Sequence, residues 1–304
     1  MDYFEGIENF ATKMQLKKKK GFALVSVVIP AFNHEPYIQR SLDSVAEQDY
    51  PNKEIVVIDD GSNDATKEKI EAWVRNNETS MKIIFKAQEN VGTAKTLNRL
   101  LDMARGDYIA LSSSDDYLLP GSLSLRVEML NKVNKKAVFG DCMVIDENDE
   151  YLHESSISGL YDGDKKLLQS NHHLPSQILR SFSIAGPAML FHRSILSSLG
   201  NFDSSLLVED WDFCLNLAVN NELAFLDHPV GVYRLHKSNT INRENSLTDG
   251  LSYEEKVYRK YKHCFRQDDL KFINRRLRRI SFKKFKLRLR ERFKSILEKL
   301  ASTM

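Results

Sequence analysis

The chain has 304 residues, of which 42% are hydrophobic, enough to bury one large core or two modest ones. Its net charge of +2 hides an asymmetry, because residues 271–299 carry +11 and the remainder therefore −9. Three scattered cysteines indicate neither a disulfide framework nor a zinc site and favour a reducing cytoplasm. Without a secretory signal or an apolar run near the ~20 residues that span a bilayer, we expect a soluble or peripherally attached protein.

Residues 1–21 carry apolar side chains at helical spacing, from Phe4 to Met14, which predicts a short packing helix in an N-terminal extension. From residue 22 to about 240, apolar runs alternate with amphipathic stretches, which predicts an α/β fold with a mostly parallel, doubly wound sheet. The expected strands are 24–29, 55–58, 82–86, 108–111, 138–145 and 224–226. The expected helices bury Ile38, Leu42 and Val45, then Ile70, Trp73 and Val74, then Leu97, Leu100, Leu101 and Ala104.

Polar loops follow the first two strands, where ligands bind in open α/β sheets. The first loop contains Phe32, Asn33 and Glu35, and the second begins with Asp59 and Asp60. Two adjacent acids repel each other and need a donor, for which a nucleobase imide N–H or a ribose hydroxyl is suitable. The alternative is an ordinary turn at the glycine of residue 61 with a helix cap after it.

The strand at 108–111 ends in Ser112-Ser113-Ser114-Asp115-Asp116. Carboxylates with open coordination positions suit a hard cation such as Mg²⁺ or Mn²⁺, which in turn binds phosphate oxygens. The alternative is an Asp-rich turn without a ligand.

A helix start at Asn90-Val91-Gly92, with Lys95 one turn further, favours phosphate through its backbone N–H groups, although an ordinary cap has the same pattern. The chain contains no G-x-G-x-x-G, which argues against a dinucleotide dehydrogenase.

Further along, Glu209-Asp210-Trp211 offers a carboxylate base beside an aromatic platform for a sugar, or simply an acidic helix start. His236 is either a packing residue or the histidine that completes a metal site. His172 and His173 are expected to be loop residues.

Together, these phrases resemble the family 2 glycosyltransferases, which have the GT-A fold, over residues 22–240. The resemblance rests on Pro30-Ala31-Phe32-Asn33-His34-Glu35, on Asp59-Asp60-Gly61-Ser62, on Asn90-Val91-Gly92 and on Glu209-Asp210. One departure is Ser113, which stands where the family pattern Asp-x-Asp-Asp has its first acid; its hydroxyl could still contact the metal or a ribose.

The resemblance implies a metal held by Asp115 and His236, with Mn²⁺ or Mg²⁺ as the cofactor, and Asp210 as the catalytic base. The expected nucleotide-sugar-binding residues are Pro30, Phe32, Asn33, Glu35, Asp59, Asp60, Asn90, Gly92, Lys95, Ser114 and Asp115. Asp116, Glu209 and Trp211 are expected beside the acceptor or donor sugar.

The implied reaction is the inverting transfer of a sugar from a nucleotide donor, expected to be a UDP-sugar, to a glycan or lipid-linked acceptor in bacterial surface-polysaccharide synthesis. One alternative is a non-catalytic nucleotide-sugar-binding scaffold, tethered at the membrane by the basic tail, which Ser113 favours. The other is a sugar nucleotidyltransferase, which the lack of a Gly-rich first loop with Arg or Lys disfavours.

Residues 241–304 are expected to form a basic amphipathic helical tail. Its apolar stripe comprises Phe282, Phe285, Leu289, Phe293, Ile296 and Leu300. Such a stripe packs on the core or on a second subunit of a homodimer, or it binds an anionic cytoplasmic leaflet. Binding to the anionic leaflet predicts a cytoplasmic protein that is peripheral on the inner face of the cytoplasmic membrane. The acidic remainder disfavours nucleic acid as a partner.

Overall fold

The computed structural model describes residues 21–237, 239 and 247–301. The helix expected between Phe4 and Met14 lies outside these residues.

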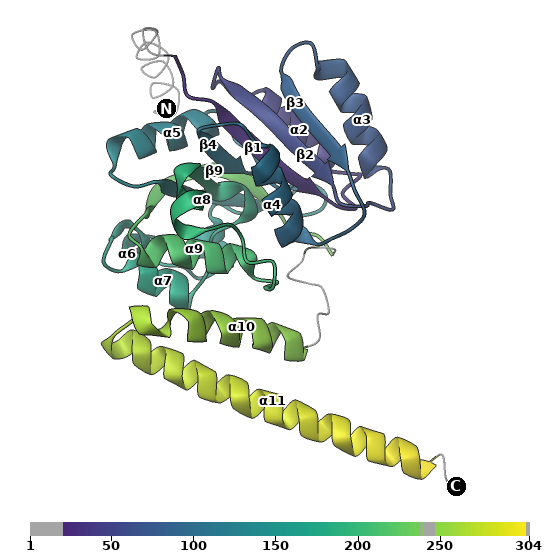
Figure 1. Ribbon diagram of the computed structural model, residues 1–304, viewed down its shortest axis with the longest axis vertical. Coiled ribbons are helices and arrows are strands. Elements are labelled where there is room, and N and C mark those ends of the chain that lie inside the picture. Colours follow the sequence, from purple (N-terminus) through teal and green to yellow (C-terminus); the bar gives the residue numbers. More distant parts are fainter. Residues whose placement is uncertain (1–20, 238, 240–246, 302–304) are drawn as a thin grey trace.

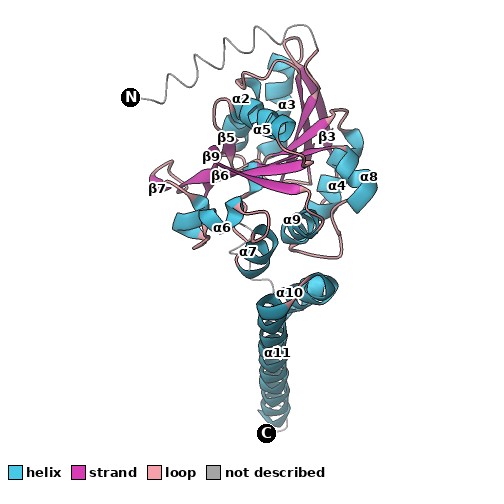
Figure 2. Cartoon of the chain, turned by 90° about the vertical axis from the view of Figure 1, so that its left-hand side faces the viewer, coloured by secondary structure: helices cyan, strands magenta, loops and turns pink. Residues whose placement is uncertain are grey.

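One mixed sheet forms the centre of the described part of the chain, as expected (Figures 1 and 2). Its strands are β1 (Val25–Ala31), β2 (Lys53–Asp59), β3 (Lys82–Ala87), β4 (Tyr108–Leu111), β5 (Tyr117–Leu118), β6 (Ala137–Ile145), β7 (Tyr151–His153), β8 (Met189–His192) and β9 (Leu223–Arg234). The order is β3-β2-β1-β4-β8-β6-β9-β5, with β7 paired to β6. The strands from β3 to β4 are parallel, whereas β8 pairs antiparallel with both β4 and β6.

Helices cover both faces of this sheet. One face packs against α2 (Ile38–Ala46), α3 (Thr66–Asn77) and α5 (Ser122–Lys132), and the other against α4 (Thr93–Met103), α7 (Leu174–Arg180), α8 (Ser194–Leu199) and α9 (Glu209–Val219). Short helices lie at Ser156–Leu160 (η1), Lys165–Gln169 (α6), Gly186–Ala188 (η2) and Lys262–Cys264 (η4). The C-terminal helices are α10 (Leu247–Tyr261) and α11 (Gln267–Ala301).

Strand β1 shows why the central apolar runs are nearly continuous. Val27 and Ile29 face the core beneath α2 and α3, while Val28 faces the core beneath α4. A parallel strand with helices on both faces has no solvent side, so both sets of side chains are apolar.

Strand β9 is much longer than the expected 224–226. Its middle contains Asp227, His228 and Pro229, which interrupt the apolar run that predicts a strand. The pairing with β6 shifts register where Asp141 faces Pro229, and a proline fits a strand at such an irregularity because it lacks the N–H. The strand then continues to Arg234 and reaches the site described below.

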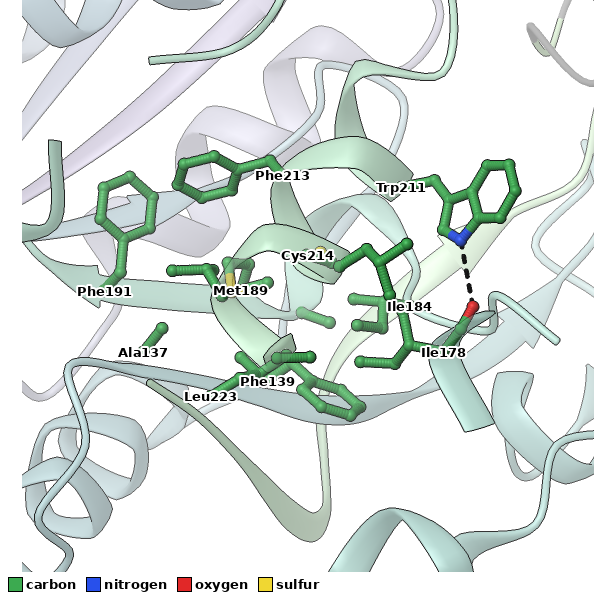
Figure 3. Close-up of a cluster of buried hydrophobic side chains, with 14 of the residues drawn as sticks. Ala137, Phe139, Ile178, Ile184, Met189, Phe191, Trp211, Phe213, Cys214 and Leu223 are labelled. Atoms are coloured by element: carbon green, nitrogen blue, oxygen red, sulfur yellow. Dashed lines mark hydrogen bonds between the residues drawn. The ribbon is translucent and has the colours of Figure 1, made fainter. Parts of the chain in front are cut away.

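A large hydrophobic cluster lies under the second half of the sheet (Figure 3). Phe213 of α9 contacts Phe191 of β8, with ring centroids 5.3 Å apart, and Cys214 lies in the same cluster. This packing fixes the position of α9, whose first residues are Glu209 and Asp210.

The two C-terminal helices are attached to this body at the end of α10. Lys260 Nζ lies 2.7 Å from Asp212 Oδ2, and the Tyr261 hydroxyl donates to the Asp212 carbonyl at 3.1 Å. From there α11 runs along α10 and extends away from the sheet (Figures 1 and 2). Among the described helices, none combines the length and the apolar character needed to cross a membrane.

Replacing Gly61 with alanine should destabilise the fold more than the same change at Gly121. Both glycines have positive φ, +77° and +75°, which costs an alanine about 1–2 kcal/mol. A Cβ at residue 61 would also lie 2.8 Å from the Asn90 nitrogen, whereas a Cβ at residue 121 meets nothing within 4 Å. We expect Gly61→Ala to lose at least about 1 kcal/mol more in urea unfolding. Equal losses would show that the contact with Asn90 adds no strain.

Candidate active site

The loops after β1 and β2 lie side by side because these strands pair in parallel up to Ala31 and Asp59. Hydrogen bonds join the loops beyond that point. Asn33 N donates to Ser62 Oγ at 2.9 Å, and Asn63 N donates to Asn33 Oδ1 at 2.7 Å. Two of the expected nucleotide-binding residues, Asn33 and Asp59, therefore have side chains that shape the edge where they were expected.

The adjacent acids Asp59 and Asp60 receive their donors from the protein itself. Asp59 accepts from the Ser62 N–H and hydroxyl at 3.1 and 2.5 Å. Asp60 accepts from Gln88 Nε2 at 2.7 Å and from the N–H groups of Val91 and Gly92 at 3.0 Å each. The expected donors are therefore present, but they come from the protein and not from a nucleobase or a ribose.

The same contacts change the interpretation of the helix start at Asn90. Two N–H groups that were expected to favour phosphate, those of Val91 and Gly92, bind the Asp60 carboxylate. Lys95 is exposed on the first turn of α4. Asp60 thus fastens the loop before α4 to the end of β2.

Asp115 lies at the centre of the acidic turn after β4, with a histidine on either side. His236 Nε2 is 2.9 Å from Asp115 Oδ2, and His34 Nε2 is 3.7 Å from the same oxygen. Ser114 Oγ lies 2.7 Å from His34 Nδ1. Burial raises the pKa of Asp115, but the hydrogen bond with His236 and the charges of both histidines outweigh it and hold that pKa below its ordinary value.

His34, Asp115 and His236 could hold a metal ion, since one ligand atom from each lies within 4.8 Å of the others. Asp115 and His236 were expected from the sequence. His34 was not, although it stands in the loop at the carboxyl end of β1, and that position was the available signal.

The side chains of Asp116 and Ser113 are hydrogen-bonded to each other. Asp116 is buried, and it accepts hydrogen bonds from the Arg234 N–H at 2.8 Å and from the Ser113 side chain. Burial and the neighbouring Asp115 charge raise the pKa of Asp116 well above its ordinary value. A Cβ on Gly186 would lie 2.5 Å from Ser113 Oγ, which marks how closely that hydroxyl packs. Ser113 thus pairs with Asp116 in place of the contact with a metal or ribose that we considered.

Arg234, which is 2% exposed, holds the acidic turn in place. Its guanidinium donates to the carbonyls of Asp115 and Asp146, each at 3.1 Å, and to Asp149 Oδ1 at 2.7 Å. The guanidinium carbon also lies 4.7 Å from the centre of the Tyr37 ring. Arg234 was not expected at the site, because a single arginine in a sequence carries no signal of such contacts.

Glu209 and Asp210 form the first turn of α9. Burial and the Asp210 charge raise the pKa of Glu209 to about 8. The Asp210 side chain is exposed to solvent. The mass of protein on its other sides raises the pKa of Asp210 by desolvation, and the Trp211 N–H, which donates to Asp210 Oδ1 at 2.7 Å, opposes that rise. A carboxylate with a raised pKa at a helix start is a suitable proton acceptor.

Tyr161 and Tyr233 link Asp210 to the acidic turn after β4. The two tyrosines share a hydrogen bond, and their ring centroids are 6.5 Å apart. Burial raises the pKa of Tyr161, and the charges of Asp210 and Asp116 raise it further. The charges of a carboxylate at the start of α9 and of one in the turn after β4 therefore both act on Tyr161.

A buried carboxylate, Asp141, anchors the segment that carries Tyr161. Its Oδ2 accepts from Ser155 Oγ at 2.5 Å and from Lys165 Nζ at 2.7 Å, on either side of that tyrosine. Neither Tyr161 nor its anchor was found from the sequence, where residues 151–187 gave no readable pattern.

The Trp211 ring is packed in the core, which contradicts its expected role as a platform beside a sugar. The indole is 9% exposed and donates to the Ile178 carbonyl at 3.0 Å (Figure 3). It also packs edge-on against Tyr258. An aromatic residue two positions after the first residue of α9 faces the core here because the helix is buried on that side.

Comparison with known families agrees with this geometry. Residues 26–200 match the family model described as glycosyl transferase family 2, which is more than half of the chain. The chain belongs to this family. The resemblance found in the sequence is thereby confirmed, and the protein is a glycosyltransferase.

This glycosyltransferase is similar to several named proteins and solved structures. It is 27% identical over 237 residues to the GalNAc(5)-diNAcBac-PP-undecaprenol beta-1,3-glucosyltransferase of Campylobacter jejuni, covering 78% of this chain and 70% of that protein. S. aureus TarS 1-349 in complex with UDP-GlcNAc has a TM-score of 0.62 at 20% identity, over 83% of this chain and 70% of that chain. The mannosyltransferase PcManGT of Pyrobaculum calidifontis, solved with GDP-Man and Mn²⁺, has a TM-score of 0.61 at 20% identity, over 89% and 75%. These likenesses confirm the expected GT-A fold.

Replacing Glu209 with glutamine should flatten the pH dependence of stability. With a pKa of about 8 in the folded state against an ordinary 4.5, Glu209 holds its proton more tightly when folded. The free energy of unfolding therefore falls as pH rises from about 4.5 to 8, and Glu209→Gln removes that slope. Urea unfolding at several pH values measures it. The control is Glu68→Gln, an exposed acid in the first turn of α3. Identical profiles for wild type and Glu209→Gln would contradict the prediction.

Proposed function

We propose that this protein is an inverting, metal-dependent glycosyltransferase that transfers a sugar from a UDP-sugar to a hydroxyl group of a glycan or lipid-linked acceptor. The observation that carries the proposal is the His34–Asp115–His236 cluster, which brings together the loops after β1, β4 and β9. The proposed catalytic unit is residues 22–240, with residues 241–304 as an attached tail.

The donor diphosphate requires a positive partner, because the edge of the sheet is rich in carboxylates. A divalent cation, Mn²⁺ or Mg²⁺, fits His34, Asp115 and His236, whose ligand atoms already lie within 4.8 Å of one another. When bound, such an ion neutralises the charge that develops on the departing diphosphate. The residues around it keep their own roles: Arg234 fixes the turn that carries Asp115, and the β1 and β2 loops shape the nucleotide side.

Asp210 is the proposed base that accepts the proton of the acceptor hydroxyl as it attacks. Its raised pKa brings the carboxylate closer to the pH at which a base works best, and Glu209, with a pKa near 8, adds little competing negative charge at neutral pH. Attack from the face opposite the leaving group inverts the anomeric centre.

The choice of donor and acceptor rests on similar proteins. TarS is described with UDP-GlcNAc, which supports a UDP-sugar, while PcManGT is described with GDP-Man and keeps a GDP-sugar as an outcome of the test. The Campylobacter jejuni relative is named for a glycan linked to PP-undecaprenol, which supports a lipid-linked acceptor and a role in surface-polysaccharide synthesis.

The first test is release of UDP from a panel of UDP-sugars with Mn²⁺, with Mg²⁺ or with EDTA. We expect slow hydrolysis of one donor, which EDTA and Asp115→Ala both abolish. Hydrolysis of a GDP-sugar instead would still support a glycosyltransferase but would identify a GDP-sugar as its donor. No turnover of any donor with the acceptor glycan present, together with intact UDP binding, would favour the non-catalytic scaffold.

Asp210→Asn should lower kcat by about 10²–10⁴-fold while leaving the affinity for UDP unchanged, because only proton transfer is lost. Asp212→Asn is the matched control on the same helix, since that carboxylate is bound to Lys260 of α10. Steady-state kinetics and UDP titration measure the two effects. An active Asp210→Asn enzyme would exclude Asp210 as the base.

The tail supports a membrane partner. Phe282 and Phe285 of α11 are 57% and 58% exposed and lie among cations, which is not the burial expected of a stripe packed on the core. Between α10 and α11 is a cavity of about 320 Å³, lined by Leu251, Glu254, Arg276, Arg279, Ile280, Phe282 and Lys283. Exposed aromatic rings beside cations fit the anionic headgroups of the inner face of the cytoplasmic membrane. The side chains of Phe293, Ile296 and Leu300 lie outside the described ones.

The double variant Arg279→Gln/Lys283→Gln should bind vesicles that contain anionic phospholipid about 30-fold more weakly. Each cation near such a surface contributes about 1 kcal/mol, so two give about 2 kcal/mol. Lys67→Gln/Arg75→Gln removes the same charge from α3 and should leave binding unchanged. Sedimentation with anionic and neutral vesicles measures this. Absence of binding by the wild type, with a dimer in solution, would assign the stripe to a second subunit.

A further inference from the structure

His34 lies in the loop after β1 with its ring turned toward Asp115. Its backbone N–H donates to Thr66 Oγ1 at 2.8 Å, which fixes the start of the side chain. Its Nδ1 lies 2.7 Å from Ser114 Oγ, and its Nε2 lies 3.7 Å from Asp115 Oδ2. Histidines that bind metals characteristically hold one ring nitrogen in a hydrogen bond and offer the other.

The second histidine approaches the same oxygen from the other side. His236 Nε2 is 2.9 Å from Asp115 Oδ2, and its ring lies at 87° to that of His34, with centroids 5.3 Å apart. The two rings meet edge to face, and their Nε2 atoms converge on one carboxylate oxygen.

These separations fit a cation. An ion that holds its ligands at about 2.1 Å puts neighbouring ligand atoms about 3 Å apart and opposite ones about 4.2 Å apart. The 2.9 and 3.7 Å separations, within an outer limit of 4.8 Å, need only small movements of the His34 ring. Three protein ligands leave further positions for phosphate oxygens.

The Ser113 hydroxyl is hydrogen-bonded to Asp116 and packs against Gly186, whereas the His34 ring already lies beside Asp115. We propose that His34 is the third protein ligand of the metal and replaces the carboxylate that is missing at residue 113. This inference rests on the proposed function, and it specifies the ligand set as two imidazoles and one carboxylate. Imidazole nitrogens favour Mn²⁺ over Mg²⁺, which prefers oxygen ligands.

The test is direct binding of Mn²⁺ to the full chain in the presence of UDP, by calorimetry and by pulsed EPR of the bound ion. Wild type should show two imidazole nitrogens coupled to Mn²⁺, and His34→Ala and His236→Ala should each show one. His34→Ala should bind Mn²⁺ at least about tenfold more weakly, with a smaller loss for Mg²⁺. His172→Ala, an exposed loop histidine, should match the wild type.

A second variant, His34→Asp, keeps three ligands and guards against a loss that reflects folding alone. It should bind Mn²⁺ through one imidazole and raise the affinity for Mg²⁺ relative to that for Mn²⁺. Two coupled nitrogens persisting in His34→Ala, or unchanged Mn²⁺ binding by Asp115→Ala, would overturn the assignment.

The outcomes separate this inference from the proposed function. Turnover of a nucleotide sugar by an enzyme whose metal ignores His34 would leave the function intact and refute the ligand. A two-imidazole metal site without any sugar transfer would support His34 as a ligand and refute the proposed function.

Discussion

The parallel pairing of β1 with both β2 and β4 is the constraint on which the rest of the site depends. Because parallel strands end at the same edge, residues far apart in the sequence, such as His34 and Asp115, are brought within 3.7 Å. Loops then join across that edge, and Asp60 ties the start of α4 to it through three donors. Of the acids at this edge, Asp60 thus stabilises the loops of the site, whereas Asp115 is a proposed metal ligand.

The other half of the site depends on a buried cation. Arg234 ends the long strand β9 and contacts both the acidic turn after β4 and the turn between β6 and β7. Burying a guanidinium is costly unless its donors are satisfied, so this residue fixes a single arrangement of the elements around it. His236 follows two residues later and gains its place beside Asp115 from that arrangement.

The sequence predicted those strands, helices and site residues that depend only on neighbouring residues in the chain. The strands up to 108–111 and their helices follow from apolar periodicity, and Asp115 follows from its place at a strand end. It failed where the outcome depends on long-range packing. Trp211 faces the core only because α9 is buried against α7 and α10. The predicted strand at 224–226 is shorter than β9 because Pro229 interrupts the apolar run, whereas in the structure a register shift lets β9 keep pairing with β6 beyond that proline. His34 was missed because its partner lies 81 residues away.

Charge explains why a histidine is a suitable replacement for the missing acid. A divalent ion held by two carboxylates has no net charge left, whereas one held by Asp115 and two neutral imidazoles keeps about one positive charge for the diphosphate. The end of β2 at this edge already carries Asp59 and Asp60, whose negative charges repel an anionic donor. An additional carboxylate at residue 113 would weaken the attraction for the donor in this setting, while His34 supplies a ligand and adds no negative charge.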